Sequence, residues 1–574
     1  MPKRFPLLLL TLLSVSSLFA AYTDIKVTEI MYNAPANGLT PGNAYEFIEL
    51  KNTGTASVNL TGLNFSIGIL WSAPTNFTLA PGAFAVLVSD PVQFAVKYPA
   101  IPIAGTYLGS LSNAGEQLKA SVGIDTFIAI KYNDNNPWPV LADGNGFSLV
   151  PTLINPTGSQ NKASLWRNSA NIGGSPGSDD PTPPVFPDVY INEVMTNPAL
   201  PGVDSIEIVN NSSSSVDISD WWLTDNKNLP QKYKMPNGSI IPAGGYLVLN
   251  ENQFGTGLNA FGLSSAGEMV FLFSADVSEN LTGFSTGWNF DGQYLNTAFG
   301  VHTNSLGKRL FVAMSHPSMG RANPAPRIGP LVIDRFNYFP DLSGDEFLSI
   351  RNISDSVVHL YSATYLDSTW EIGGISFAFP PGVSINPNEV VIITKSLPSQ
   401  FRSKYSVPAA TKIYQCSGSL NNQGETITIR AIGNLYTNAL GPYMSRIIID
   451  QVKYNDKAPW PLSCVGGGDY LKRKVLNDFG NDVANWMAAN GSIVGVKPLE
   501  ISAIDMEPNP THGFIHINGV DVINLSLFDL SGHQLQSYDV SNSNTIDLHG
   551  LATGLYIYQI QTISGKYTGK LIKQ

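Results

Sequence analysis

The sequence predicts an all-β protein that consists of several sandwich domains in series. Its 574 residues include 52 Gly and 39 Pro, and only 13% of them are charged. Short runs of β-branched and aromatic residues alternate with turn signals about every ten residues, without helical periodicity, which is typical of sandwiches and barrels. In addition, residues 132–139 (YNDNNPWP) return at 454–461 as YNDKAPWP. A Trp held between two prolines is more than a turn requires, so this stretch indicates a repeated domain.

The first repeat is expected at residues 22–178. Its strands either alternate apolar and polar side chains, which buries one face, or are continuously apolar, which indicates a fully buried strand. The clearest strands are expected at 25–30, 45–52, 83–89, 117–122 and 127–132. A turn at Gly115 and Glu116 precedes the fourth of these. Trp138 and Pro139 follow the fifth, and we expect them to form a packed structural corner.

Residues 179–187 contain four prolines and are predicted to be a linker, because Pro cannot join a sheet ladder and favours an extended spacer. The second repeat is expected at 188–326. It opens with strands at 189–195 and 205–210 that match the opening strands of the first repeat. The Trp–Pro stretch is missing from it, although Trp288 lies near the corresponding place.

The third repeat is expected at 327–497. Its strand at 346–352 repeats the pattern of residues 46–52, and the Trp–Pro stretch returns as Trp460 and Pro461. Two positions differ from the first repeat: we align Asp334 with Glu29 and Ser349 with Glu49.

The tail at 498–574 has a different pattern of short strands and turns. Ile523, Leu525 and Leu527 alternate with polar residues, so one face of that strand is expected to be buried. Its turn-forming motifs are Pro508, Asn509 and Pro510, then Asp529 with Gly532, then Gly554 with Tyr556.

The N-terminus has the pattern of a secretory signal peptide at residues 1–21. Lys3 and Arg4 precede an apolar run, and small residues follow it up to Ala20 and Ala21. The alternative is a membrane anchor. The uncharged stretch at 5–22 is short for a span of about 20 residues, which favours the signal peptide. We therefore expect a protein that is exported and not integral to a membrane.

On these motifs the three large repeats resemble the lamin tail domain. The resemblance implies an immunoglobulin-like β-sandwich that serves in binding and scaffolding, with no catalytic residues to carry over. The residues that carry it are Glu29, Glu49, Gly115, Glu116, Trp138, Pro139, Trp460 and Pro461.

The tail resembles the type A sorting domain of type IX secretion. The resemblance implies export across the outer membrane, the type IX machinery as a partner, and a final place at the cell surface or in the medium. It is carried by Pro508, Asn509, Pro510, Asp529, Gly532, Gly554 and Tyr556.

Two cysteines, Cys416 and Cys464, fall in the third repeat. Outside the cytoplasm such a pair can form a disulfide. The alternative is two unrelated buried thiols, and the sequence leaves both open.

Catalytic motifs are weak. Gly-x-Ser-x-Gly occurs at 173–177 and 283–287, but a nucleophile elbow needs a helix after the Ser, and Pro176 occupies that place in the first copy. The histidines before the tail are widely separated, and no spacing fits a transition metal. Acidic loops at 143–146 and 341–346 could supply oxygen ligands for a structural calcium ion, although Asp, Asn and Gly in turns need no metal. No cofactor is predicted.

Three further groups have a structural and a functional interpretation. Glutamates recur at matched strand positions and could form an acid–base pair, but their spacing differs between repeats, which favours a structural role. Tryptophans in the second repeat could stack on sugar rings, although core positions are more usual. A basic cluster is isolated in a chain of net charge −11, so no nucleic-acid partner is expected. The glutamates are Glu29, Glu49, Glu193 and Glu207, the tryptophans are Trp221, Trp222 and Trp288, and the basic cluster is residues 472–474.

Because the repeats and the tail cover nearly all of the mature chain, no segment remains for a catalytic domain. We predict a non-catalytic surface protein for adhesion, binding or scaffolding, with an extracellular protein or glycan as its ligand. The alternative is an extracellular hydrolase, or an accessory module that acts on extracellular polymer.

Overall fold

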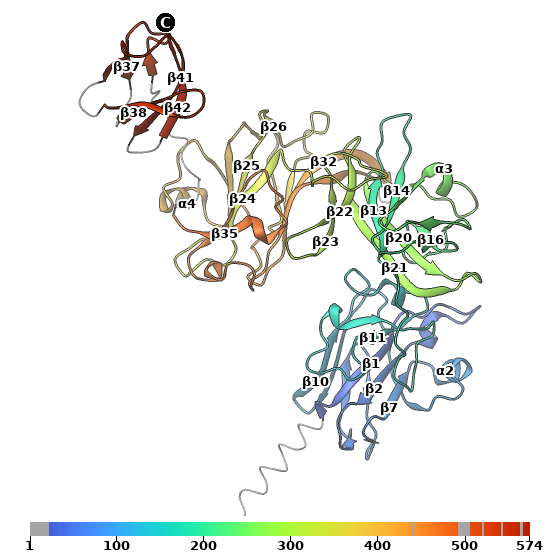
Figure 1. Cartoon of the computed structure of the whole chain (residues 1–574). Coiled ribbons are helices and arrows are strands. Elements are labelled where there is room, and N and C mark those ends of the chain that lie inside the picture. Colours follow the sequence, from blue (N-terminus) through green and yellow to red (C-terminus); the bar gives the residue numbers. More distant parts are fainter. Residues whose placement is uncertain (1–21, 439–440, 492–504, 519–521, 541–543, 563–565) are drawn as a thin grey trace, which may run out of the picture.

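The computed structural model describes residues 22–438, 441–491, 505–518, 522–540, 544–562 and 566–574. Strands make up 42% of the chain and helices 7%, which confirms the all-β prediction. Figure 1 shows three β-sandwiches that follow one another along the chain and a smaller β unit at the C-terminal end. We call them sandwich 1 (22–178), sandwich 2 (188–326), sandwich 3 (327–491) and the tail (505–574). The signal peptide expected at 1–21 lies outside the described residues.

Sandwich 1 packs a six-stranded sheet against a four-stranded sheet. All strand pairs are antiparallel except β7 and β8, which run parallel and are joined by helix α2 (Pro91–Lys97). The large sheet has the order β12 (Trp166–Asn168), β11 (Leu149–Pro151), β1 (Ile25–Met31), β2 (Phe47–Asn52), β7 (Phe84–Val88) and β8 (Ile103–Thr106). The small sheets are β10 (Asp125–Lys131), β9 (Gln117–Val122), β4 (Asn64–Ile67) and β5 (Trp71–Ser72), and the pair β3 (Val58–Asn59) and β6 (Thr78–Leu79). Short 3-10 turns are η1 (Gly42–Tyr45), η2 (Val140–Ala142) and η3 (Ala163–Leu165).

Sandwich 3 has the same strand order, including the parallel pair β30 and β31 after helix α4 (Pro398–Lys404). Its large sheet is β35 (Trp486–Ala489), β34 (Tyr470–Arg473), β24 (Leu331–Asn337), β25 (Phe347–Asn352), β30 (Val390–Thr394) and β31 (Lys412–Gln415). The small sheets are β33 (Gly441–Lys453), β32 (Thr426–Asn438), β27 (Glu371–Gly373) and β28 (Phe377–Ala378), and the pair β26 (Val358–His359) and β29 (Ser384–Ile385). Its 3-10 turns are η4 (Leu462–Cys464) and η5 (Val483–Asn485).

Sandwich 2 is reduced, because its large sheet has five strands and ends at β19. The order is β23 (Arg309–Ala313), β22 (Ala298–Thr303), β13 (Val189–Met195), β14 (Ser205–Asn210) and β19 (Tyr246–Asn250). The small sheets are β21 (Leu281–Asp291), β20 (Gly267–Ala275), β16 (Trp222–Thr224) and β17 (Tyr233–Lys234), and the pair β15 (Val216–Asp217) and β18 (Ile240–Ile241). Helix α3 (Glu251–Phe254) follows β19.

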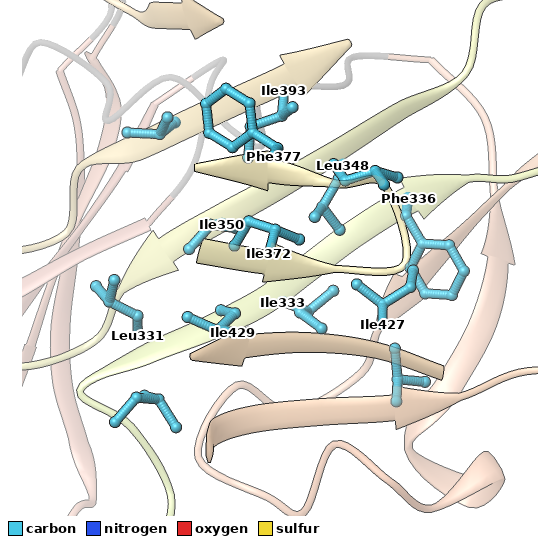
Figure 2. Packing of buried hydrophobic residues seen from close by; sticks show 14 of the residues in the cluster. Leu331, Ile333, Phe336, Leu348, Ile350, Ile372, Phe377, Ile393, Ile427 and Ile429 are labelled. Carbon is cyan, nitrogen blue, oxygen red and sulfur yellow. The ribbon is translucent and has the colours of Figure 1, made fainter. Parts of the chain in front are cut away.

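Each sandwich buries apolar side chains between its two sheets. Figure 2 shows this core in sandwich 3, where Ile333 and Ile350 of the large sheet meet Ile372 and Ile429 of the small one. The alternation expected from the sequence produces this layer, because every second side chain of a strand points to the same face.

The opening strand of every sandwich carries a β-bulge. Glu29 pairs with Glu49, Glu193 with Glu207, and Arg335 with Ser349. The alignment of Asp334 with Glu29 was therefore wrong by one residue. Asp334 occupies the extra position inside the bulge, and Arg335 takes the place of the glutamate.

Cys416 follows β31, and Cys464 ends η4. Both thiols are free in the structure, so of the two alternatives it has the unrelated thiols and not the disulfide. Burial raises the pKa of the Cys464 thiol to about 12.

The tail packs two sheets around Leu525, Leu527 and other buried residues. Asn509 ties the Pro–Asn–Pro motif to the last strand, because its side chain donates to the Lys570 carbonyl at 2.7 Å and accepts from the Ile572 N–H at 2.9 Å. The sheets are β36 (Asp505–Glu507), β37 (Phe514–Asn518) and β40 (Thr545–Asp547), and β39 (Gln534–Asp539), β38 (Val522–Phe528), β41 (Gly554–Thr562) and β42 (Lys566–Lys573).

Candidate functional site

Two buried glutamates hold the closing segment of sandwich 1 against its opening strands. Glu29 accepts hydrogen bonds from the Ser148 hydroxyl at 2.5 Å and from the Ser175 N–H at 3.0 Å. Glu49 accepts from the Gly177 N–H at 2.5 Å and from the hydroxyl of Thr28 at 2.6 Å. Ser175 of the first Gly-x-Ser-x-Gly sequence is thus part of a hydrogen-bonded closure.

Sandwich 2 builds the same closure with different neighbours. Glu193 accepts from the N–H and the hydroxyl of Ser318 at 2.7 and 2.6 Å. Glu207 accepts from the Asn192 side chain at 2.7 Å and from the Gly320 N–H. Burial raises the pKa of Glu207 to about 7. The matched glutamates thus bind backbone of their own domain, and this geometry supports the structural role that the sequence favoured.

The first two strands of sandwich 3 carry ion pairs and lack the two glutamates. Asp334 contacts the guanidinium groups of Arg335 at 3.0 Å and Arg351 at 3.2 Å. The closing segment expected for the third repeat lies outside the described residues from residue 492 on.

The Gly–Glu turn and the Trp–Pro stretch form one corner. Glu116 accepts from the Ser112 N–H at 2.8 Å and from the Tyr132 hydroxyl at 3.1 Å. Gly115 has φ +89°, and a Cβ there would lie 2.5 Å from the Cα of Asn133, so only Gly fits. In sandwich 3 the Tyr454 hydroxyl makes the same 3.1 Å contact with a glutamate. The contact holds the Gly–Glu turn against the Tyr that opens the Trp–Pro stretch, although the two residues are 16 apart in sandwich 1 and 29 apart in sandwich 3.

The tryptophans of the corner pack in the same way in both sandwiches. The rings of Trp138 and Trp166 lie 6.4 Å apart, and those of Trp460 and Trp486 lie 6.5 Å apart. Pro139 and Pro461 then precede η2 and η4.

The acidic turn of sandwich 1 receives a lysine from sandwich 2. The Lys227 ammonium lies 3.0 Å from the Asp143 carboxylate and donates to the Asp134 carbonyl at 2.6 Å. The Asn145 side chain in turn donates to the Lys227 carbonyl at 3.1 Å. This cation lies in the loop that we considered for calcium. No group of three or more His, Cys, Asp or Glu side chains among the described residues could hold a metal ion.

Apolar side chains complete the junction between sandwiches 1 and 2. Leu141 and Phe147 of sandwich 1 form one cluster with Trp222, Phe271 and Phe273 of sandwich 2. Trp222 and its neighbour in the sequence, Trp221, are both buried, so neither can present a ring to a sugar. The junction was not foreseen, because nothing in the sequence marks which surface of one repeat meets the next.

A groove of about 690 Å³ opens beside this junction. One wall is the Trp–Pro corner, and the other is made by β21 and β23, the edge strands of the two sheets of sandwich 2. Trp288 lines it, stacked on Phe311 at 5.3 Å with an interplanar angle of 2°. The indole N–H of Trp288 donates to the Ile191 carbonyl at 2.9 Å, which fixes the ring.

The groove combines aromatic rings with uncharged polar groups. The rings are those of Trp138, Phe271, Phe284, Trp288 and Phe311, and the polar side chains are Asn136, Asn168, Ser285, Thr286 and Asn289. Of its two cations, Arg309 is engaged, since it lies over the Tyr190 ring at 3.9 Å and pairs with Asp188. Lys308 is exposed. Of the tryptophans that sequence reasoning singled out for stacking, Trp288 is the one that faces a groove.

The fold and these contacts define a protein of tandem immunoglobulin-like sandwiches, with glutamate closures in the first two. The family model of the lamin tail domain matches residues 19–150 and 182–288, and that of the secretion system C-terminal sorting domain matches residues 506–574. Both families that the sequence suggested are thus confirmed, the lamin tail domain over the first two sandwiches and the type IX sorting domain over the tail. The sorting domain directs export to the cell surface or the medium, which confirms the predicted location.

No curated protein matches the chain. A DUF4876 family protein from Bacteroides thetaiotaomicron shares 12% identity over 54% of this chain and 97% of that chain, with a TM-score of 0.20. The Bacillus anthracis TIE protein shares 9% identity over 68% of this chain and 74% of that chain, with a TM-score of 0.08. Neither family model that matches belongs to a known catalytic family.

Among the described residues, no helix is both long and apolar enough to cross a membrane.

Proposed function

We propose that this chain is a non-catalytic binding protein of the outer cell surface, and that its ligand site is the groove between sandwiches 1 and 2. One observation carries the proposal: a groove of about 690 Å³ lies between two domains that are fixed to each other by Lys227 and by an apolar cluster. This volume falls within the range of roughly 300–1,000 Å³ found for ligand sites, which often lie at domain junctions.

The lining favours a glycan. Half-buried rings of Trp138 and Trp288 present apolar surface, and amide and hydroxyl groups lie beside them. A sugar ring has an apolar face and a rim of hydroxyls, so it can stack on the rings and exchange hydrogen bonds with the rim groups. The fixed ring of Trp288 costs little conformational entropy on binding.

Hydrolysis is less well supported at this groove. Glycoside hydrolysis needs two carboxyl groups on either side of the scissile bond. The groove lining formed by the described residues contains neither Asp nor Glu.

The third sandwich has the strand order of the first, and we propose that it too is a lamin-tail-type domain that serves as a spacer or scaffold.

The test is a panel of soluble polysaccharides titrated into the full chain by calorimetry. Asn289→Arg fills the groove from an exposed position, and Asn252→Arg adds the same charge on the exposed helix α3 as a matched control. We expect one glycan class to bind, with a loss of at least about tenfold in affinity for Asn289→Arg only. Equal binding by both variants would exclude the groove. Release of new reducing ends would favour the hydrolase alternative.

A further inference from the structure

Sandwich 2 lacks a strand that both of its sister domains possess. In sandwich 1, β8 pairs in parallel with β7, and Ile103 lies opposite Val86. In sandwich 3, β31 pairs in parallel with β30, and Ile413 lies opposite Ile392. In sandwich 2 the corresponding strand is β19, which is the last strand of its sheet in the described residues 188–326.

The three corresponding positions can be matched through the residues they pair with on the neighbouring strand. Val86 pairs with Glu49, Val248 pairs with Glu207, and Ile392 pairs with Ser349. Val86 is 2% exposed and Ile392 is 0% exposed, whereas Val248 is 38% exposed. In sandwiches 1 and 3 an additional parallel strand lies beside this position. In the described part of the chain, sandwich 2 has no such strand beside β19, and Val248 is exposed.

A shorter connection explains the loss. In all three sandwiches a short helix follows β7, β19 or β30, and its buried Phe is followed by the Glu of the next turn. The two are 22 residues apart in sandwich 1 and 24 apart in sandwich 3, but only 14 apart in sandwich 2. The pairs are Phe94 and Glu116, Phe401 and Glu425, and Phe254 and Glu268. The missing eight to ten residues correspond to the parallel strand and its approach.

The open edge is suited to receive a strand. The Asn210 N–H donates to the Gly245 carbonyl, and the Glu251 N–H donates to the Asp204 carbonyl. Because hydrogen-bonded pairs alternate along an antiparallel ladder, the N–H and C=O of Val248 between them point away from β14. Edge strands are usually protected by charges or Pro. The sequence of β19, YLVLN, contains neither.

We propose that sandwich 2 binds an extended segment of a partner protein as a strand parallel to β19, in the place that β8 and β31 take in its sister domains. The partner segment carries a β-branched apolar residue opposite Val248. In the other two sandwiches Ile103 and Ile413 occupy this place, opposite Val86 and Ile392. Backbone hydrogen bonds supply affinity, and contact with Val248 selects the register.

A partner protein is a better occupant than a second copy of this chain. Two copies related by a two-fold axis would pair their β19 strands antiparallel. Both strands that fill this place within the chain run parallel to their neighbour. The inference is also independent of the glycan groove, since β19 and β23 are opposite ends of the same sheet.

The probe is a labelled peptide with the sequence of residues 409–415 (AATKIYQ), which includes β31, titrated into the full mature chain and followed by fluorescence anisotropy. Val248→Pro removes the N–H that faces the open edge and keeps the pairing with β14. Val248→Lys leaves the backbone intact and places a charge on the contact surface. Val185→Lys adds the same charge at an exposed valine of the linker as a control.

We expect saturable binding that weakens at least about tenfold with both Val248 variants and with the peptide change Ile413→Glu, but not with Val185→Lys. Circular dichroism checks that the Val248→Pro chain is folded, and Val248→Lys gives an independent answer if it is not. A photoreactive group on the first peptide residue should capture residues near Tyr246, because β8 and β31 begin at that end.

Three results would overturn the proposal. The first is a peptide that does not saturate the chain, or one that binds the Val248 variants as tightly as the native chain. The second is capture near Asn250, which would mean antiparallel pairing. The third is a dimeric chain that Val248→Lys makes monomeric, since a second copy would then occupy the edge.

Discussion

At the scale of single residues, each sandwich uses different side chains to satisfy buried backbone groups of the same residue in its opening strand. The bulge in the opening strand leaves backbone polar groups of the preceding residue unpaired. In sandwich 1, the Gln160 amide accepts from the Val27 N–H at 3.2 Å and donates to its carbonyl at 2.6 Å. In sandwich 2, Trp288 donates to the Ile191 carbonyl. A buried peptide group without a partner is costly, so the position of the bulge dictates a polar side chain beneath it.

Sandwich 3 meets the same need with a buried ion pair. The Ile333 N–H donates to the Asp450 carboxylate at 2.7 Å, and Arg473 donates to the Ile333 carbonyl at 3.3 Å. Asp450 and Arg473 lie 2.6 Å apart, and the arginine side chain is fully buried. Two charges can be buried here because each neutralises the other and both bind backbone.

Gln160→Ala should destabilise sandwich 1 by about 2–6 kcal/mol, since it leaves two buried backbone groups without partners at roughly 1–3 kcal/mol each. The measurement is the unfolding free energy of the full chain in urea, followed by a probe in sandwich 1. Gln117→Ala, at an exposed position of β9, is the control and should change it by less than about 0.5 kcal/mol. Equal effects of the two variants would show that water replaces the amide.

Glu49 should make the stability of sandwich 1 depend on pH. Burial raises its pKa to about 7, although the hydrogen bonds from Thr28 and Gly177 act in the opposite direction. Between pH 4.5 and 7 the folded state then holds a proton that the unfolded state has lost, so stability falls as pH rises through this window. The loss should be about 1–3 kcal/mol between pH 5 and 8.

Calorimetric melting of the native chain and of Glu49→Gln across this pH range tests the point. Gln mimics the protonated carboxyl, so the variant should lose the share of the slope that Glu49 contributes. Glu29 and Glu46 of sandwich 1, whose pKa values burial also raises, and Glu207 of sandwich 2 should keep their own shares. A slope that is the same in the variant and in the native chain would assign the dependence to other groups.

At the scale of elements, the sequence predicts most of the strands in the buried faces, but not the elements at the edges of the sheets. Alternation and apolar runs identify β1, β2, β7, β9 and β10, because those strands form the buried faces. Helix α2 and strand β8 have no such signal, since α2 is only seven residues long and β8 contains Ala and Gly. The bulge was also invisible, because one extra residue does not interrupt an apolar pattern. The sequence alignment therefore matched the acidic Asp334 with Glu29, whereas the residue that takes the place of Glu29 is Arg335.

Gly115→Ala should destabilise the corner of sandwich 1 by more than the conformational cost of a positive φ, because its Cβ would meet the Asn133 backbone. Gly82→Ala is the matched control, with φ +72° and nothing within 4 Å of the added Cβ. We expect about 1–2 kcal/mol for Gly82→Ala and at least about 1 kcal/mol more for Gly115→Ala, measured by urea unfolding. Indistinguishable losses would show that the Gly–Glu turn can move away from the Trp–Pro stretch.

At the scale of the whole molecule, the candidate groove depends on a junction that no single repeat encodes. Glu29, Glu49 and the Trp–Pro corner could be recognised because they recur in the sequence. Lys227 occurs once, and its two partners come from turns more than 80 residues away in sandwich 1. Periodicity and repeats describe a domain, whereas a contact between domains needs the three-dimensional arrangement.

The tail predicts a result on the same scale. Removal of residues 506–574, which the sorting family model matches, should stop surface delivery, so that the protein accumulates inside the cell envelope. Immunoblotting of surface-exposed, envelope and medium fractions measures this. Asn252→Arg, far from the tail, is the control and should be delivered normally. Unchanged surface delivery of the truncated chain would refute the sorting role.

Lys227→Ala should loosen the junction without unfolding either sandwich. The substitution leaves the Asp143 carboxylate next to the Asp134 carbonyl with no cation, and this uncompensated charge favours separation of the domains so that water can reach it. Lys232→Ala removes a partly buried ion pair inside sandwich 2, with Asp225, and is the control. Pairs of spin labels on sandwiches 1 and 2 should give a single distance in the native chain and in the control, but a broad distribution in Lys227→Ala. Because the groove is formed by both domains, glycan affinity should fall in parallel with this broadening. A narrow distribution in Lys227→Ala would mean that the apolar cluster alone fixes the two domains.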